Sequence, residues 1–145
     1  CRCTPDQVRR YRGRLSGPLL DRIDLQIFVP RASPSAMLAD TPTNPGGGTV
    51  DARRQVVAAR ERQNRRQGCA NTALGAEAVR HLAMSAEART VLGQALERLA
   101  LSARGLHRLI KVAQTLTDLE GGDRIDTPQV AEALGYRGQD VTPTR

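Results

Sequence analysis

The sequence predicts a mainly α-helical protein in which one helix and one strand precede a larger helical region. The only aromatic residues among the 145 are Tyr11, Phe28 and Tyr136, so Leu, Ile, Val and Ala must form the core. That mixture suits packed helices better than two packed sheets. Signals that start and stop helices also recur along the chain, and residues 101–120 carry the longest amphipathic pattern.

The stretch 101–120 predicts a long helix that begins at Ser102. Its apolar residues recur at intervals of three and four, the spacing of one helical face: Leu106, Leu109, Ile110, Ala113, Leu116 and Leu119. Ser102 is placed to cap the first turn, and Gly121 and Gly122 should end the helix. Arg104 lies in the first turn, where a rigidly held guanidinium suits phosphate binding. A solvated surface arginine is the alternative.

Residues 1–29 predict one helix followed by one strand. Thr4 should cap the helix, with Pro5 in the first turn and Gln7 completing a capping box. The run 25–29, Leu-Gln-Ile-Phe-Val, has the composition of a buried strand. A buried strand needs partners for its backbone. Because the chain also opens at Cys1 rather than at methionine, we expect those partners in a longer protein.

The stretch 30–49 is interrupted by prolines and ends in three consecutive glycines, which predicts a flexible linker or surface loop. A phosphate-binding loop would require a lysine directly after the glycines. The only lysine of the chain is Lys111. A Walker-type nucleotide cradle is therefore excluded within these residues.

Four more helices complete the predicted secondary structure. The first should be capped by Thr49 or Asp51 and run to 66, with a thin apolar face made of Val50, Val56, Val57 and Ala59. The second spans about 75–83. Ser85 should cap the third, which ends near 99. Thr127 and Pro128 should begin the last, which ends at 133 or 134 before a loose tail at 138–145.

The net charge is +7, and all basic residues but Lys111 and the two histidines are arginines. An arginine-rich surface fits phosphate partners, either nucleic acid or nucleotide, although a GC-rich genome produces the same bias. The predicted helix that ends at 66 is a candidate nucleic-acid-binding surface through six arginines, with a solvated helix face as the alternative. These are Arg53, Arg54, Arg60, Arg62, Arg65 and Arg66.

Two further function classes are limited by composition. No apolar run approaches the roughly 18 residues that span a bilayer, so we expect a soluble, cytoplasmic protein without membrane contact. The three cysteines are an odd number, which argues against a disulfide scaffold. Cys1 and Cys3 could supply half of a zinc site whose other half lies elsewhere, or they are free thiols.

Several motifs together resemble the C-terminal third of magnesium-chelatase-like AAA+ ATPases, and within them the bacterial ComM/YifB subgroup. The most specific is GPLLDRIDL at 17–25, and the resemblance covers nearly the whole chain apart from 30–48. The other matching stretches are Cys3-Thr4-Pro5, Leu101-Ser102-Ala103-Arg104 with the following helix, Arg124-Ile125, and 130–137.

This resemblance implies an organisation and two site residues. Residues 1–29 would be the trailing edge of an AAA+ core, 30–49 a linker, 50–137 the helical lid domain and 138–145 a tail. Arg22 matches the arginine finger, which acts in trans on the ATP of a neighbouring subunit. An ion pair with Asp21 or Asp24 is its alternative role. Arg104 matches the sensor-2 arginine, which contacts the ATP phosphates.

The resemblance also implies what the full-length protein does. It would bind ATP and magnesium, hydrolyse ATP as a homo-oligomeric ring, expected to be a hexamer, and act on DNA, for example in branch migration. The isolated chain lacks Walker A and Walker B, so we expect it to be monomeric and inactive and to bind no nucleotide tightly. A subunit of a metal-chelatase motor is a further alternative. Gln114 departs from the family, which often has arginine there.

Overall fold

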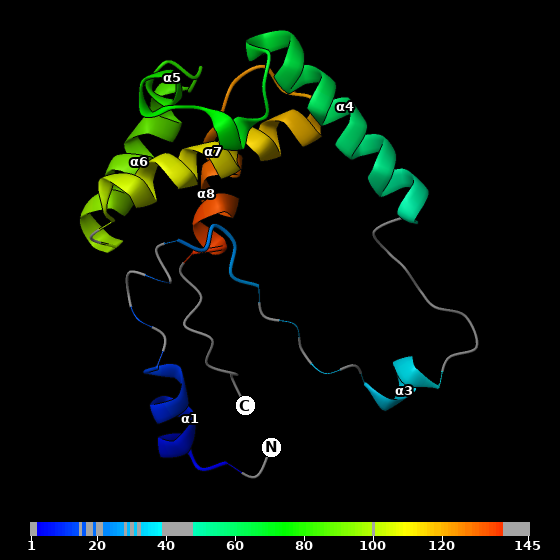
Figure 1. Ribbon diagram of the computed structural model, residues 1–145, viewed down its shortest axis with the longest axis vertical. Coiled ribbons are helices and arrows are strands. Elements are labelled where there is room, and N and C mark those ends of the chain that lie inside the picture. The colour runs from blue at the N-terminus through cyan, green and yellow to red at the C-terminus, as the bar shows by residue number, and fades with distance from the viewer. Residues whose placement is uncertain are drawn as a thin grey trace.

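Helix α7, Ala103–Glu120, lies at the centre of the helices between residues 49 and 135 (Figure 1). The computed structural model describes residues 3–14, 16, 19, 22–27, 29, 31, 33–38, 48–99 and 101–137. Its secondary structure there is mainly helical, as predicted. The remaining elements are α1 Pro5–Arg12, α3 Pro34–Met37, α4 Thr49–Gln67, the 3-10 turn η1 Asn71–Ala73, α5 Ala76–Arg80, α6 Ala86–Leu99 and α8 Thr127–Gly135.

The core is aliphatic and is centred on α7. This helix contacts α4, α5, η1 and α8, while α8 also packs on α6. The buried cluster contains no aromatic side chain, which confirms the expectation from composition. Its members are Leu74, Val79, Leu82, Ala88, Leu92, Leu109, Ile110, Ala113, Ile125, Val130 and Ala133. Helices α1 and α3 lie apart from this helical body, which we define as residues 49–135 (Figure 1).

The helix ends around α7 are confirmed. The Ser102 hydroxyl accepts a hydrogen bond from the Gly105 amide at 3.0 Å, and the Ser85 hydroxyl accepts one from the Ala88 amide at 3.3 Å. Gly121 ends α7 with a φ of 85°, a left-handed conformation that glycine adopts without steric cost. Three local signals in the sequence therefore set the position of this helix and of its neighbour.

Two other predicted caps are wrong by one residue or more. Gly48, rather than Thr49 or Asp51, precedes α4 in the extended conformation that a cap requires. At α8 the cap is Asp126 rather than Thr127, and the Gln129 side chain accepts from the Asp126 amide at 3.0 Å. In both places the cap is the residue directly before the predicted threonine: Gly48 before Thr49 and Asp126 before Thr127.

The predicted apolar face of α4 is confirmed at Ala59 but wrong at its three valines. Val50, Val56 and Val57 are 75%, 52% and 48% exposed, whereas Ala59 and Gln63 are buried. The N-terminal part of α4 extends away from α7, which leaves about half or more of the surface of each valine exposed (Figure 1). Only the C-terminal half of the helix is fixed by tertiary contacts.

The strand expected at 25–29 is absent among the residues described there. Leu25, Gln26, Ile27 and Val29 belong to no strand, because no ladder partner is available in the part of the chain that the structure covers. The Gln26 amide instead donates to the Tyr136 carbonyl at 2.8 Å. The one isolated β-bridge found is parallel and joins Met84 to Ile125.

The stretch 30–49 contains the short helix α3, which the proline-rich pattern did not predict. Residues 39–47 and the predicted tail 138–145 lie outside the described residues. Among the helices that can be inspected, none has the length and apolar character needed to cross a membrane.

Candidate functional site

The segment that carries Arg22 is attached to α7 through Arg108. One terminal nitrogen of the Arg108 guanidinium lies 2.9 Å from the Asp24 carboxylate and also donates to the Arg22 carbonyl. Such a nitrogen carries two hydrogens, so it can serve both acceptors. Asp24 is thus engaged by Arg108 rather than by Arg22. The other alternative partner of Arg22, Asp21, lies outside the described residues.

Arg104 lies one helical turn before Arg108, at the start of α7. Its side chain is exposed, and within the described residues its guanidinium has no hydrogen bond or ion pair. A rise of about 1.5 Å per residue separates the Cα atoms of Arg104 and Arg108 by about 6 Å along the axis. The structure therefore brings the two arginines proposed from the sequence, Arg22 and Arg104, to the same end of one helix.

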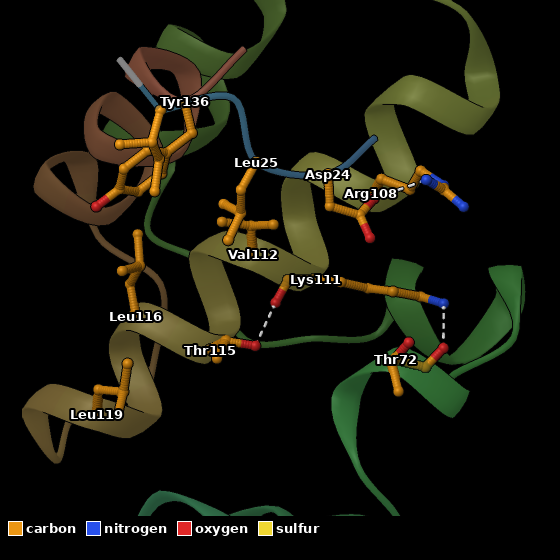
Figure 2. Close-up of a pocket in the computed structure, with 11 residues that line it drawn as sticks. Asp24, Leu25, Thr72, Arg108, Lys111, Val112, Thr115, Leu116, Leu119 and Tyr136 are labelled. Atoms are coloured by element: carbon orange, nitrogen blue, oxygen red, sulfur yellow. Dashed lines mark hydrogen bonds and ion pairs between the residues drawn. The ribbon is translucent and has the colours of Figure 1, made fainter. Parts of the chain in front are cut away.

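A pocket of about 450 Å³ lies between residues 24–27 and α7. Figure 2 shows its charged side chains, Asp24, Arg108 and Lys111, on one side and Leu116, Leu119 and Tyr136 on the other. Lys111 donates to the Thr72 carbonyl at 3.0 Å, which ties α7 to η1. The pocket is thus mainly apolar, with the Asp24–Arg108 ion pair in its lining.

A buried polar network fixes the other end of α7. Asp118 is fully buried, and its carboxylate accepts from Arg66 at 2.6 and 3.0 Å, from Asn71 at 2.8 Å and from Gln114 at 3.1 Å. Burial by itself would raise the pKa of Asp118, but these hydrogen bonds and the charge of Arg66 outweigh it and lower the pKa below its usual value of 3.8. The network joins α4, η1 and α7.

Comparison with known proteins decides the family. The model for the C-terminal part of the magnesium chelatase subunit ChlI matches residues 47–137, which is more than half of the chain. The chain belongs to the magnesium chelatase ChlI C-terminal family. A second model, for the magnesium chelatase subunit ChlI itself, matches residues 1–37. The resemblance drawn from the sequence motifs is therefore confirmed.

Several relatives of this ChlI-type chain are similar over nearly all of its length. It is 41% identical over 137 residues to the competence protein ComM of Haemophilus influenzae, covering 94% of the chain. It is 39% identical over 140 residues to the uncharacterized protein YifB of Salmonella typhimurium, covering 96%. The matches span 26% and 27% of those proteins, so the chain corresponds to about a quarter of each relative.

Gln114 has a structural role in this ChlI-type chain. It is buried, and its side-chain amide donates to the Asp118 carboxylate, so this position supplies no second basic group on α7. The network was not predicted from the sequence, although the sequence of α7 contains an indication of it. Gln114, Thr117 and Asp118 are polar residues that flank or interrupt the apolar stripe of α7, and buried polar groups require hydrogen-bond partners.

The cysteines offer no assembled metal site in the described part of this ChlI-type chain. Cys3 is exposed and free, and Cys1 lies outside the described residues. Nowhere in the residues that can be examined do three or more His, Cys, Asp or Glu side chains gather as potential metal ligands. The half-site suggested by Cys1 and Cys3 remains a prediction.

The six arginines of α4 divide into two groups. Arg54 pairs with Asp51 at 2.6 Å, Arg66 pairs with Asp118, and Arg62 is partly buried beside Gly121. The others, Arg53, Arg60 and Arg65, are exposed and have no ion pair within the described residues. Half of the basic residues of this ChlI-type helix are therefore available to a partner.

Proposed function

We propose that this chain is the helical lid, with the adjoining edge of the core, of a ring-forming ATPase that remodels DNA. The observation that carries the proposal is that Arg104 and the turn at residues 22–24, here called the Arg22 turn, lie at one end of α7. The Arg104 guanidinium is exposed and is unpaired in the described part of the chain. Membership of the magnesium chelatase ChlI family supports it.

In this proposal the two arginines act on different phosphates. Arg104 binds the phosphates of ATP from the lid, and Arg22 reaches the γ-phosphate of ATP held by the adjacent subunit. A guanidinium there stabilises the negative charge that develops on the transferred phosphoryl group. Magnesium would enter with ATP, and Arg22 and Arg104 cannot be its ligands because a guanidinium is a cation.

DNA is the proposed substrate because one relative is named a competence protein, and competence is the uptake of DNA by bacteria. Branch migration is the specific activity that we propose. The ring is proposed to be a homo-hexamer in the cytoplasm, with residues 50–137 as the lid of each subunit.

Replacing Arg104 with alanine in the full-length protein tests the proposal. We expect a fall of about 100-fold in kcat/KM for ATP hydrolysis, because a phosphate contact that strengthens in the transition state is lost. Arg89→Ala is the matched control, since Arg89 is also an exposed helical arginine but lies on α6. Equal turnover in Arg104→Ala and Arg89→Ala would exclude the assigned role of Arg104.

A second candidate function, nucleic-acid binding by α4, is favoured by its exposed arginines Arg53, Arg60 and Arg65. If the chain binds DNA through them, the double variant Arg53→Ala/Arg60→Ala should weaken binding and reduce the slope of log K against log salt by about 2. The control Arg89→Ala/Arg98→Ala removes the same charge from α6. Fluorescence anisotropy with labelled duplex DNA, measured across a salt series, checks this, and equal slopes in the two double variants would rule out α4 as the contact surface.

A further inference from the structure

We propose that Arg108 is a positioning residue that fastens the Arg22 turn to α7, so that the lid sets the position of Arg22. The inference rests on the proposed function, because it concerns how Arg22 is presented to the neighbouring subunit. It assigns to Arg108 a role different from that of Arg104, although the two lie one turn apart on the same helix.

The attachment has two parts, which lie on either side of Leu25. Arg108 holds the Asp24 carboxylate at 2.9 Å and the Arg22 carbonyl through one nitrogen of its guanidinium. Two residues after Asp24, the Gln26 amide donates to the Tyr136 carbonyl at 2.8 Å. Leu25 and Ile27 line the apolar pocket over α7. The segment 22–27 is thus held by a charge pair and two hydrogen bonds to backbone carbonyls.

The charge of Arg108 is already matched by Asp24, whereas that of Arg104 is not matched within the described residues. The Arg108 side chain is 30% exposed and the Asp24 side chain 49%, so the pair is partly shielded from water. Arg108 is 86 residues away from Arg22 in sequence. Because of this contact, a change in the position of α7 would change the position of Arg22 directly. The change would not have to pass along the chain through residues 30–49.

The test is a double-mutant cycle in the full-length protein. Arg108→Ala should lower kcat for ATP hydrolysis about tenfold, because a displaced catalytic group loses effectiveness steeply. In an Arg22→Ala background the same substitution should have no further effect, because Arg108 acts through Arg22. Asp24→Asn should lower kcat less than Arg108→Ala does, because Arg108 can still donate to the Arg22 carbonyl, and Arg108→Lys should retain part of the activity. An undiminished effect of Arg108→Ala in the Arg22→Ala background would overturn the proposal, since it would indicate a general role in the lid.

A second measurement does not depend on ATP turnover. Amide hydrogen exchange at Gln26, measured without nucleotide, should become about fivefold faster in Arg108→Ala and Asp24→Asn and stay unchanged in Arg89→Ala. Unchanged exchange at Gln26 in all three variants would also overturn the proposal. If Arg22→Ala left turnover intact, the proposed function would fail, while exchange at Gln26 would still decide whether Arg108 fastens the turn.

Discussion

Replacing Arg22 with alanine in the full-length protein is expected to lower kcat for ATP hydrolysis by about 1,000-fold, the lower end of what an arginine finger contributes. The KM for ATP should change little, because Arg22 acts on the nucleotide of another subunit. Steady-state kinetics with purified protein measures both quantities. Arg14→Ala is a suitable control, since Arg14 is exposed and lies outside the turn that contacts α7.

Mixing variants tests whether Arg104 acts in cis while Arg22 acts in trans, or whether both act in trans from the same subunit. If Arg104 acts in cis, each ATP in a ring needs Arg104 from its own subunit and Arg22 from the next. In that case, mixing Arg22→Ala and Arg104→Ala subunits in equal amounts gives rings in which about a quarter of the interfaces contain both arginines. If the interfaces act independently, about a quarter of the wild-type turnover should return. No recovery in mixed rings would place both arginines on the same side of the interface.

Replacing Asp118 with alanine should destabilise the chain by about 3 kcal/mol, which is the low end of the cost of breaking a buried ion pair. The low end applies because Arg66 is 31% exposed and can recover part of its hydration. The substitution also leaves the buried amides of Asn71 and Gln114 without their shared acceptor. Urea unfolding followed by circular dichroism measures the change. Asp123→Ala, in an exposed loop, should change stability by less than about 0.5 kcal/mol.

The contribution of Asp118 should depend on pH in the acid range. Its pKa is lowered in the folded state, so the stabilisation is complete above the unfolded value of 3.8 and is lost as the pH falls through the folded value. The stability difference between wild type and Asp118→Asn should therefore be constant near neutral pH and shrink below about pH 4. A constant difference down to pH 2 would show that Asp118 is not the ionised acceptor of the network.

The starts of α6 and α7 and the end of α7 could be predicted from the sequence because they depend on neighbouring residues. Ser85 and Ser102 each cap the helix that follows, and Gly121 ends α7, without any contribution from distant parts of the chain. Arg104 was located for the same reason, since it occupies the first turn of a helix whose start was clear. Its role as a phosphate ligand came from the family resemblance and stays a proposal.

The remaining features depend on contacts between distant residues. The pair of Asp24 and Arg108 and the network around Asp118 join segments far apart in the chain, so no local pattern specified them. The strand at 25–29 was inferred from composition, but composition cannot supply a ladder partner. The valines of α4 were assigned to an apolar face by spacing, although the adjacent helix covers only the other half of α4.

Helix α7 also has a mechanical consequence. Its 18 residues make a rod about 27 Å long, with Arg104 in the first turn and Asp118 in the last. A hydrogen-bonded helix is stiff along its axis, so a force along the axis at Arg104 also acts at Asp118. Asp118 forms an ion pair with Arg66, which lies on α4 together with the exposed Arg53 and Arg60. One helix and one ion pair therefore connect the exposed guanidinium of Arg104 to the C-terminal part of α4.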